Sequence, residues 1–403
     1  MLTRFIEILI PRFIRNGIQH FFQYLTGYSP EIQQHHRAIE RLEQTIILLE
    51  REVRKNQRIT QCLSEQGQYK DVQALIAGLE KVSPAGALID SSKFKLLIKN
   101  EIERYPGGIY NPGALSLEGG GVVLLARGEK YMEIERAKDG GKMMSGATPL
   151  LIECDEKLEF SGARALKPAG FPRGGAIRLE DFRIIQYQGQ IYAHHSLVSF
   201  SPFYRFRNDR TYFSRQVLSR VNAKDGRLEF LGEIKLDRVV SSIEKNWLFL
   251  ARKRELYLFY SFSPHYVVKK LTDWHDLSFK TVIDMPLKVA GLEDIPYISY
   301  STNPVSYDEK HELILVHARS GKHIKDYLHW GVLIDKTSLK PVKMTRRPIV
   351  RGGDARGIYK HVVFVTAVIP SGNDFMLVMG EGDFYSSTVR VMRGELEEVW
   401  TEL

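Results

Sequence analysis

The stretch LEDFRIIQYQGQIYAHHS, residues 179–196, carries the pattern that decides the fold. Polar residues open a short apolar run, a Gln-Gly pair follows, and a second apolar run ends again in polar residues. Short alternating or apolar runs bounded by turn residues are typical of β-strands. The stretch therefore predicts two strands joined by a turn, and it places two acidic residues, Glu180 and Asp181, at the start of the first strand.

The same outline recurs four more times between about residue 105 and residue 403. It is found in YNPGALSLEGGGVVLLARGE, EKNWLFLARKRELYLFYSFSPH, STNPVSYDEKHELILVHARS and KHVVFVTAVIPSGNDFMLVMGEGD. Counted from Asn111, Asp181, Asn246, Asn303 and His361, successive repeats are 57 to 70 residues apart. Units of this length, each worth about four strands, predict an all-β five-bladed β-propeller over residues 105–403. A β-sandwich or two stacked β-domains is the alternative.

The propeller prediction also groups polar residues from distant parts of the chain. Because the innermost strand of each blade lines a central channel, we expect the starts of the first strands and the ends of the second strands to meet at one mouth. The predicted substrate-binding residues are Asn111, Arg127, Glu180, Arg183, Lys245, Asn246, His265, Asn303, His317, His361 and Asp383; His194, His195 and Arg319 occupy similar strand ends. Convergent polar groups in one funnel predict a binding site.

Some of these residues have a purely structural alternative. Asn111 and Asn303 each precede a proline and would equally well cap turns. Lys245 could form an ion pair with Glu244 or Asp181. Either role would leave the polar side chain without a direct contact to a substrate.

The acidic pair is harder to explain structurally. Adjacent strand residues face opposite sides of a sheet, so one carboxylate of the pair Glu180 and Asp181 should point inward. A buried carboxylate needs a partner, and Arg183 is the nearest candidate in the sequence. We therefore expect at least one of the two carboxylates to act in the site.

The first 28 residues have a basic amphipathic pattern. Apolar residues recur at helical spacing beside Arg4, Arg12 and Arg15, and no apolar run reaches the roughly 18 residues of a membrane span. A signal peptide is disfavoured because Pro11 and Arg12 interrupt the apolar stretch and no small-residue cleavage site follows. We predict a helix over 1–28 that either packs against protein or lies in the plane of an acidic membrane surface.

A coiled coil is predicted over 31–67. Heptad spacing is kept by Ile39, Leu42, Ile46, Leu49 and Val53. Alternation of β-branched residues with leucine favours a parallel dimer, so a homo-oligomer joined through 39–63 is expected, with a helix pair inside one chain as the alternative. Residues 68–104 are predicted to form a helical linker to the propeller.

The overall composition limits the partners. The chain has 57 Lys and Arg against 48 Asp and Glu, a formal charge of +9 that favours anionic partners. No long basic run of the nucleic-acid-binding kind is present. Cys62 and Cys154 show neither disulfide nor zinc spacing, so no metal or other cofactor is predicted and a reducing, cytoplasmic setting is expected.

The ordered motifs between 105 and 393 resemble glycoside hydrolase family 130, the five-bladed propellers that include β-mannoside phosphorylases, and the related β-1,2-mannosyltransferases of glycosyltransferase family 108. The most specific matches are Glu-Asp-x-Arg at 180–183 and Gly-x-x-Asp at 380–383. The resemblance implies that Asp181 is the general acid acting on the glycosidic oxygen. Phe182 stands where the family motif has proline.

The chemistry of glycosyl transfer agrees with a carboxyl group at the base of a dry funnel. Basic neighbours such as Lys245, and the segment FYRFRNDRTYFSRQVLSR at 203–220, favour an anionic cosubstrate, although that segment also fits a solvated loop. We predict an inverting glycosyltransferase that builds a cell-surface polysaccharide or glycolipid from a nucleotide-sugar and a glycan acceptor, held at the inner membrane surface. A β-mannoside-type phosphorylase or hydrolase, using phosphate or water, and a non-catalytic sugar-binding propeller are the alternatives.

Overall fold

The computed structural model describes most of the chain beyond residue 86. The described residues are 87–98, 105, 107–129, 131–132, 144–145, 147–172, 177–200, 212–238, 244–292, 295, 297–320, 326–352, 355–357, 359 and 361–403. The predicted amphipathic helix over 1–28, the coiled coil over 31–67 and most of the linker over 68–104 lie outside them. Of the helices in the described part, none is long and apolar enough to span a membrane.

The described residues are almost entirely β-structure, with one 3₁₀ turn, η1 (Ser91–Lys93), and one short helix, α5 (Arg393–Glu397). Two sheets begin the propeller-like part. The first contains β2 (Ile109–Ser116), β3 (Val122–Gly128), β6 (Thr148–Cys154) and β7 (Phe160–Ala165). The second contains β9 (Ile177–Tyr187), β10 (Gln190–Phe200), β11 (Tyr212–Asn222), β12 (Arg227–Glu233) and β8 (Lys167–Ala169).

Three further sheets follow in chain order. The third contains β14 (Leu248–Arg252), β15 (Glu255–Ser261), β16 (His265–Asp273), β17 (Ser278–Pro286) and β13 (Lys235–Leu236). The fourth contains β18 (Ser299–Tyr300), β19 (Val305–Ser306), β20 (His311–Ser320), β21 (Asp326–Asp335), β22 (Pro341–Thr345), β23 (Val350–Arg351) and β27 (Trp400–Glu402). The fifth contains β24 (Val363–Ser371), β25 (Asp374–Glu381), β26 (Tyr385–Val391) and β1 (Lys95–Leu96). A separate pair joins β4 (Tyr131–Met132) to β5 (Met144–Ser145).

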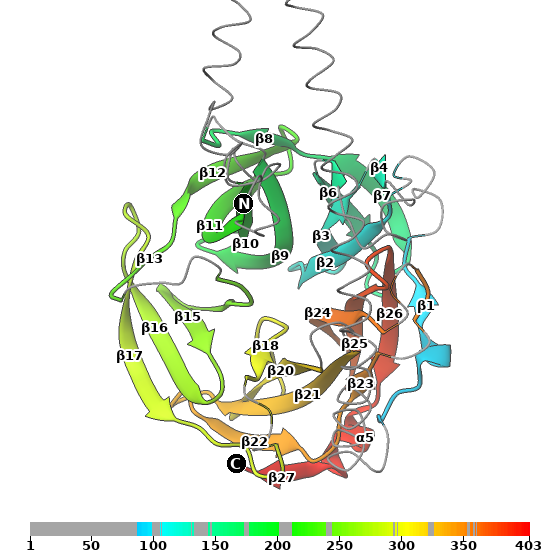
Figure 1. The fold of residues 1–403 in the computed structure, drawn as a ribbon, viewed down its shortest axis with the longest axis vertical. Helices are drawn as coiled ribbons and strands as arrows, with labels where there is room; N and C mark the ends of the chain where they lie inside the picture. The colour runs from blue at the N-terminus through cyan, green and yellow to red at the C-terminus, as the bar shows by residue number, and fades with distance from the viewer. Residues whose placement is uncertain are drawn as a thin grey trace, which may run out of the picture. The chain divides into compact units, whose positions relative to one another are not determined.

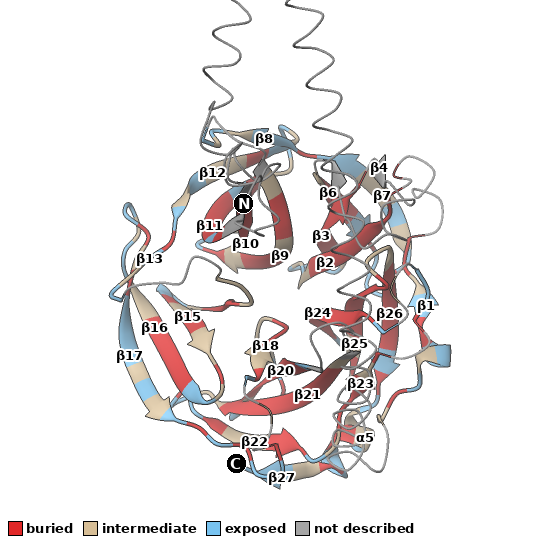
Figure 2. Ribbon diagram, viewed as in Figure 1, coloured by how far each residue is buried: buried red, intermediate tan, exposed pale blue. Residues whose placement is uncertain are grey.

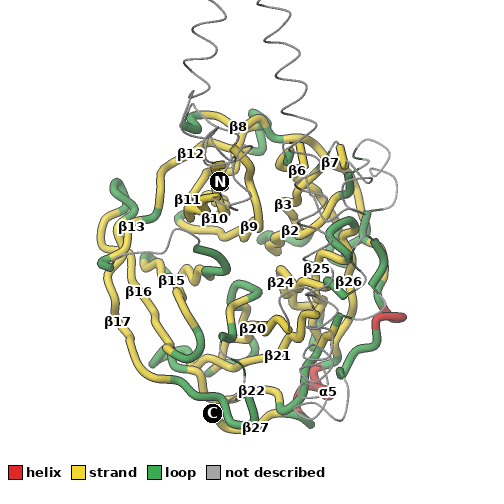
Figure 3. The backbone as a smooth tube through the Cα atoms, in the orientation of Figure 1, coloured by secondary structure: helices red, strands yellow, loops and turns green. Residues whose placement is uncertain are grey.

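These five larger sheets follow one another around a common centre (Figure 1). Within each sheet, consecutive long strands run antiparallel and are joined largely by short turns, as the alternation of strand and loop in Figure 3 shows. Inner strands such as β3 and β24 are mostly buried (Figure 2), because each sheet has a neighbouring sheet on either side, whereas outer strands such as β8, β12 and β17 are largely intermediate or exposed. The all-β propeller predicted from the sequence is therefore confirmed in this coarse form.

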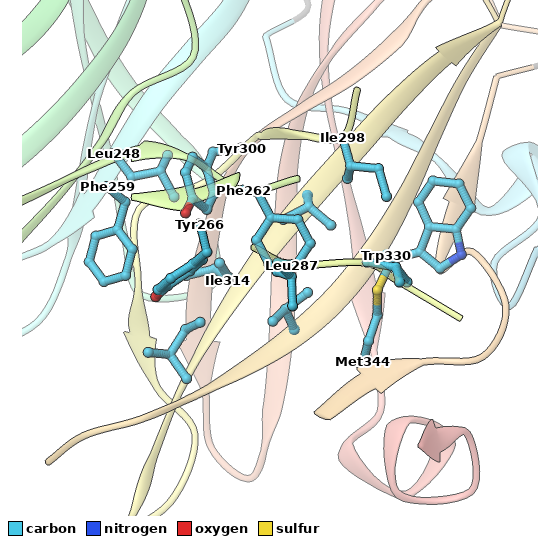
Figure 4. Close-up of a cluster of buried hydrophobic side chains, with 14 of the residues drawn as sticks. Leu248, Phe259, Phe262, Tyr266, Leu287, Ile298, Tyr300, Ile314, Trp330 and Met344 are labelled. Atoms are coloured by element: carbon cyan, nitrogen blue, oxygen red, sulfur yellow. The ribbon is translucent and has the colours of Figure 1, made fainter. Parts of the chain in front are cut away.

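Buried hydrophobic clusters join each sheet to the next. The cluster drawn in Figure 4 lies between the third and fourth sheets and includes Leu248, Phe259, Tyr266, Ile314 and Trp330. Equivalent clusters lie between the fourth and fifth sheets, the fifth and first, the first and second, and the second and third. Because each sheet contributes apolar side chains to both neighbours, burial of apolar surface closes the ring.

The strand composition differs from the even four-strand units expected from the repeats. The larger sheets hold four to seven strands because short segments from elsewhere add to their edges. β1 pairs with β26, and β27 pairs with β22, so residues from both ends of the described part complete sheets formed by other segments. The β-structure also begins before the predicted start at residue 105, since β1 lies within the segment expected to be helical.

A buried lysine, Lys269, pairs with the carboxylate of Asp237 at an outer edge of the third sheet. Lys269 on β16 is fully buried and donates hydrogen bonds to Asp237 and, at 2.6 Å, to the hydroxyl of Thr281. Thr281 also donates its backbone N–H to Asp237 at 2.7 Å. Burial alone would raise the pKa of Asp237, but these hydrogen bonds outweigh it and lower the pKa to about 2.

The Asp237 carboxylate therefore contributes stability that is present above its unfolded pKa and is lost as the pH falls through the folded value. We expect the melting temperature of the wild-type protein to fall as the pH drops from about 4 to about 2, and the Asp237→Asn variant to lose less over that interval. Melting curves at closely spaced pH values measure this difference. Parallel pH profiles for the two proteins would contradict the assignment.

Candidate active site

Asp181 sits in a β-bulge within β9, as the fifth residue of a strand that begins earlier than the sequence suggested. In the pairing of β9 with β10, Glu180 faces Ser196 and Arg183 faces His194, so Asp181 and Phe182 together oppose the single residue between them. Asp181 has a φ of 57°, in the left-handed region. Bulges of this kind bend a strand and re-aim a side chain, and they are common next to active sites. The bulge breaks the in-and-out alternation that made adjacent charges in a strand look anomalous.

The equivalent positions of two other repeats have the same backbone conformation. Asn111 on β2 has a φ of 52° and belongs to a two-against-one bulge, since Tyr110 pairs with Arg127 while Gly113 pairs with Leu125. Asn246, immediately before the third sheet, has a φ of 65°. Asn and Asp adopt the left-handed region more readily than other non-glycine residues. Three of the five equivalent repeat positions thus have a left-handed backbone conformation, and of these three only Asp181 has a carboxylate side chain.

Phe182 packs into the core. Its ring is fully buried in the cluster between the first and second sheets, 5.2 Å from the ring of His195. Its counterpart in β2 is Pro112, the second residue of the bulge. Gly113 lies against the same point of β9, where an added Cβ would fall 2.5 Å from the carbonyl oxygen of Phe182. The departure from the family motif at Phe182 therefore changes core packing and not the group that faces the site.

Asp181 is held between an amide and an ammonium group. Its side chain is 15% exposed. Asn111 donates a hydrogen bond from Nδ2 to Oδ1 at 3.3 Å, and Lys245 Nζ lies 3.6 Å from Oδ2. These contacts come from three different sheets or their edges, so the structure brings these three segments together.

Glu180 belongs to a network of buried charges beside Asp181. Its carboxylate is 2.9 Å from Lys245 Nζ, 3.2 Å from Arg178 Nε and 3.7 Å from Arg127 Nη2. The side chain of Glu129 is fully buried and lies 3.0 Å from Arg127 Nη2 and 3.1 Å from Arg178 Nη2. With Asp181, the network sets three carboxylates against three cations, so its charges compensate one another within a poorly solvated region.

The buried ring of Tyr110 packs against Arg127 of this network. The guanidinium of Arg127 lies 4.7 Å from the centre of the Tyr110 ring, a cation–π distance. Burial disfavours the charged form of Arg127, but Tyr110, Glu180 and Glu129 outweigh it and hold the pKa of Arg127 above its usual value. Burial raises the pKa of Tyr110 well above its usual value. Arg127 therefore remains charged and pairs with Glu129, directly after its own strand β3, and with Glu180 of β9.

Asp383 lies in the turn between β25 and β26, with a φ of 52°. Its carboxylate is near the same tyrosines as the Asp181 region. Burial raises the pKa of Tyr327, and the carboxylates of Asp383 and Asp181 raise it further. Asp383 also raises the pKa of Tyr110. The late Gly-x-x-Asp motif thus places its carboxylate within electrostatic range of the same two tyrosines that border the Asp181 region.

The sequence suggested that Arg183 neutralises the acidic pair. In the structure Arg183 is buried, but it forms no ion pair with Glu180 or Asp181 among the described contacts. Its side chain turns onto backbone carbonyl groups, and the carboxylates are instead contacted by Lys245, Arg178 and Arg127. The bulge between Glu180 and Arg183 breaks the regular side-chain alternation of β9, and the guanidinium lies on the carbonyls of Phe182 and Ser301. The predicted contact of Arg183 with substrate stays a prediction.

Two other predicted site residues hold the sheets together. Asn303 donates from Nδ2 to the carbonyl of Ile184 at 3.0 Å and accepts from the N–H of Phe249 at 3.1 Å. His317 is buried and bonded to the Ser301 hydroxyl at 2.9 Å. Burial, with the nearby charge of Arg183, lowers the pKa of His317 to about 3, so this ring is neutral near pH 7. Asn303 therefore connects the fourth sheet to the second and third sheets, and neither of its two hydrogen bonds caps a local turn.

Some predicted residues are not brought to the Asp181 region by any described contact. His265 is 64% exposed and lies 3.6 Å from Asp284 on the outer part of the third sheet. His361 is exposed ahead of β24. In the basic segment 203–220, Arg215 and Arg220 are paired with Glu233 and Glu229, and the preceding arginines lie outside the described residues.

The histidine pair His194 and His195 is also absorbed into the core. His194 lies between the rings of Trp247 and Phe249, and His195 is bonded to the Ser219 hydroxyl at 2.9 Å. Burial lowers the pKa of His195 to about 4. His194 contacts the cluster between the second and third sheets and His195 the cluster between the first and second, so both rings are buried because each face of the second sheet is covered by a neighbouring sheet.

Sequence reasoning missed Arg178 and Glu129. Each stands two residues from a predicted member, Arg178 before Glu180 and Glu129 after Arg127. Residues two apart in a strand share a face. The spacing of two residues from Glu180 and from Arg127 could therefore have indicated that Arg178 and Glu129 belong to the same site. Within the described ranges, no group of three or more His, Cys, Asp or Glu side chains is arranged to hold a metal ion.

A cavity of about 380 Å³ lies elsewhere, between the first and second sheets. It is lined mainly by apolar side chains, including Leu117, Val122 and Val221, with Cys154 among them. Leu117 follows the last residue of β2, whereas Asn111 is near the start of that strand. The cavity therefore opens at the opposite strand ends from Asp181 and is not part of the candidate site.

Gly380 keeps Asn111 in place. A Cβ at this position would overlap the side-chain oxygen of Asn111 and lie 2.9 Å from its backbone nitrogen. We expect Gly380→Ala to push Asn111 away from Asp181 and to lower turnover by about tenfold or more, since small displacements of catalytic groups are costly. Steady-state kinetics measure the effect. Gly162→Ala, where nothing lies within 4 Å of the added carbon, is the control; equal losses in both variants would contradict the role of Gly380.

No protein-family model matches the sequence, and no curated protein matches it. Solved structures do match. A β-1,2-mannobiose phosphorylase from Listeria innocua is 17% identical, with 79% of this chain and 97% of that chain covered and a TM-score of 0.53. A putative glycoside hydrolase from Parabacteroides distasonis is 12% identical, with 70% and 86% covered and a TM-score of 0.52.

A GDP-Man-dependent mannosyltransferase from Leishmania mexicana is also similar. It is 12% identical, 79% of this chain and 93% of that chain are covered, and the TM-score is 0.50. The fold is thus the propeller of these carbohydrate-active proteins. The family 130-like propeller that the sequence motifs predicted is confirmed at the level of fold.

Proposed function

We propose that this chain is a carbohydrate-active enzyme in which Asp181 acts as the general acid of an inverting glycosyl transfer. The observation that carries the proposal is the left-handed bulge at Asp181, which presents a partly exposed carboxylate beside Asn111 and Lys245, where segments of three sheets meet. A general acid must reach the glycosidic oxygen and remain shielded from bulk water. An exposed fraction of 15% agrees with both demands, because the carboxylate is accessible from outside while most of its surface is covered by protein.

The surrounding groups suit recognition of a sugar. Asn111, Asn246 and Asp383 share the left-handed conformation of Asp181. Amide groups donate and accept hydrogen bonds and carboxylates accept them, so both kinds of group pair well with sugar hydroxyls, which can do either. We infer that the sheets bearing these residues act as the blades of a five-bladed propeller, supported by the hydrophobic clusters that join each larger sheet to the next.

The favoured activity is transfer from a nucleotide-sugar to a glycan acceptor. A phosphorylase or hydrolase of β-linked mannosides is the second candidate, favoured by the fold shared with the mannobiose phosphorylase. The three described cations around Glu180 and Asp181 already face three carboxylates. We therefore expect the phosphate or diphosphate group to be bound by other residues of the chain. A propeller that only binds sugar would have the same fold without turnover.

One experiment separates these activities. The purified chain is incubated with GDP-mannose and a β-mannoside acceptor, with β-1,2-mannobiose and phosphate, and with β-1,2-mannobiose in water alone. Mass spectrometry then detects an extended glycan with GDP, mannose 1-phosphate, or free mannose, respectively. The same panel is repeated with other nucleotide-sugars. Saccharide binding without any product in all arms would exclude the enzyme and favour the binding protein.

The proposed location rests on residues outside the described part. The basic amphipathic pattern of 1–28 and the heptads of 39–63 suit an oligomer held at an acidic membrane surface. We expect a protein lacking residues 1–65 to elute as a smaller species and to lose sedimentation with anionic vesicles. A truncated protein that still sediments with those vesicles would argue against anchoring.

A further inference from the structure

Arg183 makes an unusual set of contacts with the backbone. It is 2% exposed, yet no carboxylate lies within ion-pair distance among the described residues. Nε donates to the carbonyl of Ser301 at 2.7 Å, and Nη1 donates to the carbonyl of Phe182 at 3.0 Å, with the carbonyl of Asp181 at 3.5 Å. Burial lowers the pKa of Arg183 to about 10, so the group is still charged near pH 7.

The two carbonyls on its own strand belong to the bulge. Successive carbonyls of a regular strand point in opposite directions, as successive side chains do. Asp181 and Phe182 depart from that rule because the two residues oppose one residue of β10. One Nη1 atom can then reach both carbonyl oxygens. The guanidinium therefore contacts the strand where its conformation is irregular.

The third carbonyl lies on a distant segment. Ser301 follows β18 in the fourth sheet, 118 residues along the chain, and Arg183 thereby joins β9 to that sheet. The guanidinium also lies 5.3 Å from the ring centre of Phe364, which extends the contact to β24 of the fifth sheet. An Arg has a rigid, planar set of donors that a Lys lacks. This geometry suits a clamp between strands that do not pair with each other.

We propose that Arg183 is a positioning residue that clamps the bulge of β9 and so fixes the direction of the Asp181 carboxylate. The left-handed conformation is costly for a non-glycine residue and persists where surrounding structure enforces it. Arg183 supplies that enforcement from within the core, while Asn111 and Lys245 orient the carboxylate from the open side. The conformational part stands on the geometry alone; its consequence for turnover rests on the proposed function.

The conformational part is tested by the crystal structure of Arg183→Met, which keeps an unbranched side chain but removes all donors. We expect residue 181 to leave the left-handed region and the Asp181 carboxylate to move away from Lys245. Arg183→Lys keeps the charge but cannot reach three carbonyls together, and it serves as the milder variant if Arg183→Met does not accumulate as folded protein. A bulge that is unchanged in either structure overturns the proposal.

The functional part is tested by separating turnover from binding. For Arg183→Lys we expect kcat to fall by about 100-fold while KM stays within about threefold, because the clamp touches no substrate. A rise in KM with kcat preserved would make Arg183 a substrate ligand and overturn the positioning role. Arg164→Met, at an exposed ion pair with Glu153, is the control and should keep wild-type kinetics. If Asp181→Asn is fully active, the proposed function fails, and the crystal structures still decide whether Arg183 clamps the bulge.

Discussion

The Asp181→Asn variant is expected to fold like the wild-type protein and to lose glycosyl transfer by about 10²-fold or more, as when a general acid is removed. Asparagine should be tolerated because Asn111 and Asn246 already hold the same left-handed conformation at equivalent positions. Its side chain can still accept from Asn111, and the contact that is lost, to Lys245, is 3.6 Å long. Initial rates and melting temperatures of the two proteins measure the separation of activity from stability.

Asp276→Asn provides a matched control, because it makes the same chemical change at an exposed ion pair with Lys235. It should retain the wild-type rate. An Asp181→Asn protein with wild-type activity would remove Asp181 from the mechanism. A protein that loses its activity only together with its fold would also count against the acid role, because asparagine is expected to fit the bulge.

Glu129→Ala is expected to have the largest effect on stability. The carboxylate is fully buried and contacts both Arg127 and Arg178. Removing one member of a buried ion-pair network leaves the remaining charges uncompensated, which costs about 3–5 kcal/mol. The free energy of unfolding from urea titrations measures the loss. Arg127 and Arg178 also contact Glu180. Without Glu129 we expect both arginines to move toward Glu180, to displace the neighbouring Asp181 and so to lower the activity of the protein that remains folded.

The comparison variant is Glu153→Ala, which removes a carboxylate from an ion pair with Arg164 at 2.8 Å in which both side chains are about half exposed. Pairs of this kind contribute little, because water already solvates both charges. Its free energy of unfolding should stay close to that of the wild type. Similar losses in Glu129→Ala and Glu153→Ala would show that the buried network is not important for stability.

The sequence predicted the propeller because its repeats are local patterns. Each outline of polar start, apolar run, turn and second run encodes a strand pair through side-chain period and turn residues, and the near-regular spacing predicted a ring of such units. The equivalence of Asn111, Asp181 and Asn246 followed from that spacing, and the shared left-handed conformation agrees with it. For Asn303 and His361 the same spacing did not bring the side chains to Asp181, because Asn303 bonds to the backbone of two other sheets and His361 lies on an exposed segment.

The sequence could not assign partners to the charges. Glu180, Lys245, Arg127 and Glu129 come from different sheets or sheet edges, and their distances are set by how those sheets pack. Arg183 illustrates the difficulty, because it stands two residues from Asp181 in sequence, yet it is turned away from that carboxylate and onto backbone carbonyls. A regular strand would have kept the two side chains on one face.

IRLEDFRII, residues 177–185, shows where the two kinds of information divide. By itself the sequence determined that this stretch is a strand of a repeated β unit, because apolar periodicity and turn chemistry act between near neighbours. Only the tertiary structure decided that Asp181 faces Lys245 while Phe182 enters the core and Arg183 contacts Ser301. The reason is that a bulge shifts the register of every side chain near it, and its position depends on strands that lie far away in the sequence.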